Sequence, residues 1–76
     1  MAKVAMVRFT NSKYLAVRRS ENMLDIMIEI SQRRLKRVQR FAEFLSRQGL
    51  LSWIESAYGG IWLVIRLFEK VSKNGS

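Results

Sequence analysis

Apolar and small side chains recur at alternating steps of four and three residues along the first half of this 76-residue chain. The positions concerned are Leu24, Ile28, Ser31, Leu35, Val38, Ala42 and Leu45. This spacing forms one stripe on an α-helix and predicts a long amphipathic helix over residues 21–48. Ser20 or Asn22 can cap its start, and Gly49 is well placed to end it.

The segment that follows shows the same alternating spacing. Its apolar positions are Leu50, Ile54, Ala57, Ile61, Val64, Phe68 and Val71. Ser52 and Glu55 match the capping box that starts many helices, so we expect a second helix over residues 52–73. The pair Gly59-Gly60 costs helix stability and can split this helix in two. Two helices joined by a short loop predict an antiparallel helical hairpin.

Residues 1–19 follow a different pattern. Apolar Ala5, Val7 and Phe9 alternate with their neighbours, which is typical of a β-strand. A turn near residues 11–13 and a second strand over 14–18 would make a hairpin, and a single strand followed by irregular chain is the alternative. The expected fold is therefore α+β and mostly helical: a short N-terminal strand or hairpin, then the helical hairpin, in one small domain.

The predicted second helix is apolar on more than one face, so one partner helix cannot cover it. Without cysteine or histidine, a chain of this length has neither disulfides nor the usual zinc sites to supplement its core. Self-association is the remaining way to bury more apolar surface, and we expect a homodimer. The residues predicted to form this oligomer or partner interface are Trp53, Tyr58, Ile61, Trp62, Ile65 and Phe68.

Positive charge dominates the composition, with 14 basic against 6 acidic residues and a net charge of +8. Five bases fall within eight positions of the first predicted helix: Arg33, Arg34, Lys36, Arg37 and Arg40. On that helix they form a convex basic ridge suited to phosphate groups. We therefore expect a nucleic-acid-binding protein, with DNA as the expected ligand, and contributions from Arg18 and Arg19.

The main alternative is a small protein-interaction module, an inhibitor, adaptor or accessory subunit. It would dock on a protein partner through the apolar face of the second helix, while its bases meet an acidic surface. A membrane-surface role is disfavoured, because the bases and the aromatic residues fall on different predicted helices. No signal peptide or membrane span is expected, and the lack of cysteine suits the cytoplasm.

Catalysis is not expected either, since the commonest acid–base and nucleophilic groups are missing. Glu21, Asp25 and Glu29 recur every four residues, but an acidic row in the first turns of a helix is usually explained by the helix dipole. We therefore expect no metal ion and no cofactor.

Overall fold

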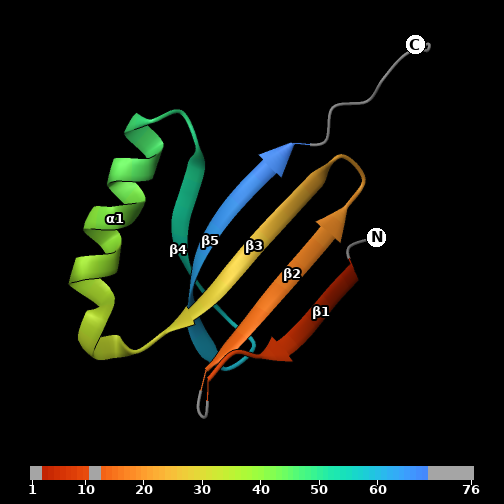
Figure 1. The fold of residues 1–76 in the computed structure, drawn as a ribbon, viewed down its shortest axis with the longest axis horizontal. Coiled ribbons are helices and arrows are strands. Elements are labelled where there is room, and N and C mark those ends of the chain that lie inside the picture. Colours follow the sequence, from red (N-terminus) through yellow and green to blue (C-terminus); the bar gives the residue numbers. More distant parts are fainter. Residues whose placement is uncertain (1–2, 11–12, 69–76) are drawn as a thin grey trace.

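The computed structural model describes residues 3–10 and 13–68. This part of the chain forms a five-stranded antiparallel sheet with a single α-helix (Figure 1). The elements are β1 (Lys3–Arg8), β2 (Tyr14–Ser20), β3 (Met23–Ile30), the 3₁₀ turn η1 (Gln32–Arg34), α1 (Leu35–Arg47), β4 (Leu51–Ala57) and β5 (Gly60–Phe68). The expected mostly helical fold is therefore wrong, because most of the described residues lie in strands.

The sheet consists of a three-stranded meander and a hairpin. Its strand order is β1-β2-β3-β5-β4, and every neighbouring pair is antiparallel. Helix α1 links the two units and lets β5 pair with β3 along eight positions, from Met23 opposite Phe68 to Ile30 opposite Ile61. The N-terminal hairpin alternative is confirmed, since β1 and β2 pair along the length of β1.

The predicted second helix over residues 52–73 is instead the hairpin of β4 and β5, and residues 69–73 lie outside the described part. Tyr58 and Gly59 both have positive φ angles, 50° and 75°, as the two central residues of a type I′ turn do. Gly59-Gly60 thus marks a strand reversal rather than a helix break. In β5, Trp62, Leu63 and Val64 are all buried, so a strand covered on both faces produces the continuous apolar run that suggested a helix.

The predicted long helix is correct only in its second half. Residues 23–30 form β3, in which Leu24, Ile26 and Ile28 alternate with Asp25 and Met27. This two-residue period was present beside the helical spacing, and the β-branched isoleucines favour the strand. The predicted end of the helix is confirmed.

Gly49 ends α1 with a φ of 94°, in the left-handed region that favours glycine. Its N–H donates to the carbonyl of Ser46, and the N–H of Leu50 donates to the carbonyl of Leu45. These are the two bonds of a Schellman motif, which satisfies carbonyls left free at a helix end.

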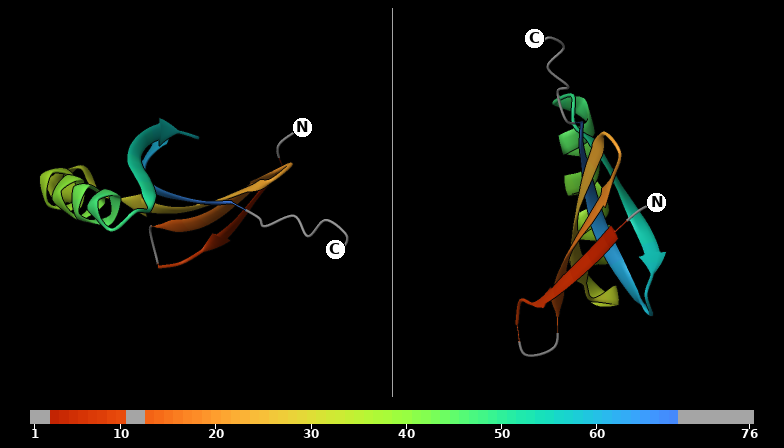
Figure 2. Two further views of the ribbon diagram at one scale, coloured as in Figure 1. Left: turned by 90° about the horizontal axis from the view of Figure 1, so that it is seen from above. Right: turned by 90° about the vertical axis from the view of Figure 1, so that its right-hand side faces the viewer.

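The sheet curls strongly, so that β4 turns out of the plane of the other strands (Figure 2). The core lies on the inside of this curl, where Ala16, Met27, Trp62 and Val64 are buried. The indole Nε1 of Trp62 donates a 2.6 Å hydrogen bond to the carbonyl of Ala57 and so ties β5 to the end of β4. Helix α1 packs beside β4 through its buried residue Ala42.

The β4–β5 turn provides a direct test of the strand assignment. A Cβ at Gly59 would meet no atom within 4 Å, so the cost of Gly59→Ala arises from the backbone conformation alone. We expect this variant to lose about 1–2 kcal/mol of unfolding free energy, measured by urea denaturation. Gly59→Asn is the matched control and should lose less, because asparagine tolerates positive φ. Equal stability of all three proteins would contradict the turn.

Candidate nucleic-acid interface

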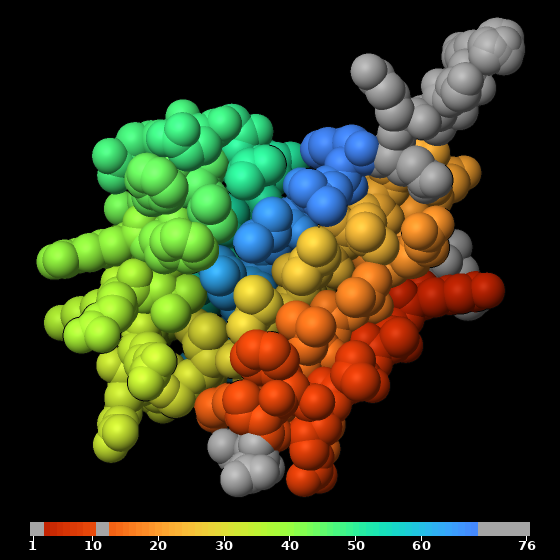
Figure 3. Space-filling model, in the orientation of Figure 1, coloured from red at the N-terminus to blue at the C-terminus, as the bar shows by residue number. Residues whose placement is uncertain are grey.

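The five bases predicted to form a ridge lie together, at the start of the helical segment. Arg33 and Arg34 belong to η1, and Lys36, Arg37 and Arg40 belong to α1. All five are exposed, because the opposite side of α1 carries the buried Ala42. The side chains of this yellow-green segment project away from the body of the protein (Figure 3). The five bases thus lie together on η1 and the first turns of α1, and not along one long helix as predicted.

Four of these residues line one shallow hollow of about 310 Å³: Arg33, Lys36, Arg37 and Arg40. We call these four residues, together with Arg34, the basic cluster. Within the described residues, no ion pair or side-chain hydrogen bond occupies any of the five. Their charges therefore face solvent and are available to an anionic ligand.

A second, more apolar hollow adjoins the basic cluster. It has a volume of about 450 Å³ and lies between the end of the β1–β2 hairpin and the start of the helical segment. Ile28, Ile30 and Val38 supply apolar walls, and Phe9 stands at its edge with 63% of its surface exposed. Arg33 lines both hollows, so the two are adjacent.

Arg18 and Arg19, also predicted to bind nucleic acid, lie far along β2 from this cluster (Figure 1). Arg19 is exposed and lines a small hollow with Leu24 and Phe68 at the other end of the sheet. Arg18 points to the inside of the curl, where its side chain is 18% exposed and pairs with carboxylates. The structure therefore does not bring these two residues together with the basic cluster.

The Arg18 guanidinium belongs to a network of four charged residues on four strands. Its Nε donates to Oδ2 of Asp25 at 3.0 Å, and its Nη1 donates to Oε2 of Glu55 at 2.8 Å. Arg66 donates from Nε to Oδ1 of Asp25 at 2.7 Å and lies 4.9 Å from the centre of the Trp53 ring. Asp25 is 3% exposed, so its charge depends on the two arginines for compensation.

These contacts shift the pKa values of the four charged residues in the network. Hydrogen bonds from Arg66 hold the pKa of Asp25 below its ordinary value, against the opposing effect of burial, and Arg18 adds to the lowering. The hydrogen bonds from Arg18 likewise lower the pKa of Glu55. In turn Glu55 raises the pKa of Arg18, and Asp25 raises that of Arg66. Sequence reasoning missed the network because it placed Asp25 on a helix.

The predicted interface residues do not form one face. Trp62 is 2% exposed and belongs to the core, whereas Tyr58 and Phe68 are exposed at opposite ends of β5. Trp53 and Ile61 are half-buried, as is Ile65. Because neighbouring side chains of a strand point to opposite faces, Ile61 and Ile65 lie on the face opposite Trp62. The apolar helix face expected to dock on a partner therefore does not exist.

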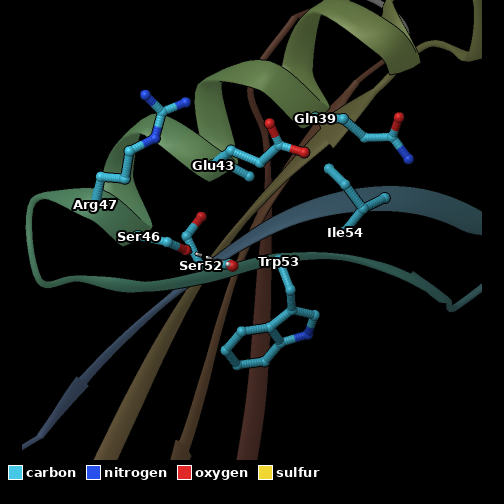
Figure 4. Close-up of a pocket in the computed structure, with 8 residues that line it drawn as sticks. Gln39, Glu43, Ser46, Arg47, Ser52, Trp53 and Ile54 are labelled. Carbon is cyan, nitrogen blue, oxygen red and sulfur yellow. Dashed lines mark hydrogen bonds between the residues drawn. The ribbon is translucent and has the colours of Figure 1, made fainter.

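A further hollow, of about 640 Å³, lies between α1 and β4 (Figure 4). Gln39, Glu43 and Arg47 reach it from the helix, and Ser52 and Ile54 reach it from the strand. One carboxylate and one guanidinium share its rim, so it lacks the net positive charge that attracts polyanions.

The acidic row Glu21, Asp25 and Glu29 also differs from expectation. Asp25 pairs with arginines, and the Oε1 of Glu29 accepts a hydrogen bond from the backbone N–H of Tyr14. In the described part of the chain, no group of three possible ligands is placed to hold a metal ion. No helix there is long and apolar enough to cross a bilayer.

The network predicts how stability depends on pH. The folded pKa values of Asp25 and Glu55 lie below their ordinary values of 3.8 and 4.5. The two charged carboxylates therefore contribute their full stabilisation of the fold above about pH 5, and this contribution is lost as pH falls below the ordinary values towards the folded pKa values. We expect the urea-derived unfolding free energy to be lower at pH 3 than at pH 7. Glu55→Gln should show a smaller decrease, since one of the two carboxylates is removed. A decrease of the same size in this variant would contradict the role of Glu55.

Comparisons with protein families, with curated proteins and with solved structures found no match for this chain.

Proposed function

We propose that this protein binds nucleic acid through phosphate contacts made by the basic cluster. The observation that carries the proposal is the gathering of five exposed bases without a carboxylate partner among the described residues. Elsewhere in the fold, Asp25 and Glu55 neutralise Arg18 and Arg66. The charge of the basic cluster is left for an external polyanion, and a phosphate backbone supplies a matching row of charges.

The dimensions of the cluster support this proposal. Seven residue steps separate Arg33 from Arg40, which corresponds to roughly 10 Å along a helix axis. One nucleic-acid strand carries a phosphate about every 3.4 Å along a duplex axis, so the cluster can meet about three phosphates. Arginine adds bidentate hydrogen bonding to phosphate oxygens, and four of the five residues are arginine. DNA is the expected ligand, and a cytoplasmic location is part of the same proposal.

A salt series with a labelled DNA duplex tests the proposal. We expect Arg37→Glu/Arg40→Glu to weaken binding at least tenfold and to make the dependence of log affinity on log salt shallower by roughly 1.8, at about 0.9 per lost phosphate contact. Arg19→Glu/Arg47→Glu is the matched control, because it changes the net charge equally on exposed residues outside the basic cluster and outside β1. Equal weakening in both variants, or no binding at low salt, would contradict the proposal.

A second candidate, self-association through β1, is favoured by one observation. All six residues of β1 are exposed, and this strand pairs only with β2 within the described chain. Val4, Met6 and Val7 are 41%, 44% and 60% exposed. An apolar strand with a free edge is a template for pairing with another chain. This surface replaces the absent second helix as the place for the homodimer expected from the sequence.

The mass of the protein in solution, measured by sedimentation, tests this second candidate. Wild-type protein should sediment as a dimer at micromolar concentration, and Val4→Lys/Met6→Lys should sediment as a monomer, because like charges opposed across paired strands repel. Arg37→Glu/Arg40→Glu should leave the dimer intact. A monomeric wild-type protein, or a dimer that the lysine substitutions do not affect, would exclude β1 as the interface.

A further inference from the structure

We infer that the apolar hollow beside the basic cluster receives an unpaired base, so that the preferred ligand is single-stranded nucleic acid. This inference rests on the proposed function and names the class of ligand more narrowly. We call this hollow the base pocket, with the lining residues Phe9, Lys13, Ile28, Ile30, Arg33, Arg34 and Val38 used below.

The chemistry of the base pocket changes from floor to rim. Ile28 and Ile30 of β3 and Val38 of α1 supply apolar side chains. Phe9 supplies an exposed aromatic ring. Its backbone is held in place because the backbone N–H of Phe9 donates a 2.8 Å hydrogen bond to the carbonyl of Lys13. Nucleic-acid bases stack on exposed aromatic rings of this kind without regard to sequence.

Positive charge outweighs negative charge at the rim, which favours an anionic occupant over a neutral one. Lys13 comes from the β1–β2 hairpin, and Arg33 and Arg34 come from the opposite side. Glu29 adds one carboxylate to the lining, and its Oε1 accepts a hydrogen bond from the backbone N–H of Tyr14. Arg33 also lines the hollow of the basic cluster, so a strand whose phosphates lie on that cluster can turn one base into the pocket. An apolar site with a basic border and an aromatic edge is the combination that single-strand binding proteins use.

The size of the base pocket and the cost of unpairing a base favour a single-stranded ligand over a duplex. The volume of about 450 Å³ falls within the range of small-ligand sites and exceeds what one base needs. In a duplex, each base is stacked and paired, and a few kcal/mol must be spent to turn one out. An unpaired strand avoids that cost, so the same phosphate contacts yield tighter binding to single-stranded nucleic acid.

The test compares a labelled oligothymidylate with a duplex of the same length, by fluorescence anisotropy over a salt series. We expect the wild-type protein to bind the single strand more tightly. Phe9→Ala should weaken single-strand binding about tenfold, leave duplex binding unchanged and keep the salt dependence, because no phosphate contact is lost. Phe68→Ala is the matched control, since Phe68 is also 63% exposed but lies at the far end of the sheet.

An abasic oligonucleotide of equal length separates the contribution of the base from that of the phosphates. The wild-type protein should bind it about tenfold more weakly than oligothymidylate, and Phe9→Ala should bind both equally. The inference is overturned, with the proposed function intact, if duplex and single strand bind equally and Phe9→Ala changes neither. Absence of binding to every oligonucleotide at low salt would overturn the proposed function together with the inference. Thermal melting of each variant confirms that it is folded.

Discussion

The ion-pair network inside the curl is the constraint on which the shape of this protein depends. Arg18 on β2 meets Glu55 on β4 although β3 and β5 lie between these strands in the sheet. That contact is possible only if the sheet bends until β4 faces β2. Asp25 anchors the centre of the network, and replacing one member would leave buried charge without compensation. The contacts of this network exist in one curvature of the sheet, so they stabilise that curvature while both carboxylates are charged.

The curvature of the sheet determines where the core and the helical connection lie. It encloses Ala16, Met27, Trp62 and Val64, which gives a chain of this length a core without disulfides. The connection from β3 to β4 then runs along the outside as η1 and α1. The start of this connection lies beside the end of the β1–β2 hairpin, where Phe9 and Arg33 line the same hollow. The proposed phosphate contacts and the proposed base pocket are adjacent for this reason.

The fold could be predicted only in part. The extended N-terminal segment and the end of α1 at Gly49 were inferred correctly, since each depends on residues close in sequence. The bases at positions 33–40 lie together for the same reason, and their role stays a proposal. The failures share one cause. Strands in both segments also fit the 4-3 spacing: in β3 the alternating residues Leu24 and Ile28 coincide with it, and β5 in the middle of the sheet is apolar on both faces. The pair Gly59-Gly60 was a hairpin signal, but the predicted helix around it suggested a break instead.

By itself, the sequence determined the charge, the clustering of bases at positions 33–40, the absence of cysteine and histidine, and the local turn at Gly49. These are properties of composition or of a few neighbouring residues. Only the tertiary structure decided that Arg18 is a structural cation, that Trp62 is core, and that Phe9 stands beside Arg33. Arg18 and Glu55 are 37 positions apart, and their contact depends on the pairing of β3 with β5. Such pairing is set by burial across the whole sheet, which no local spacing encodes.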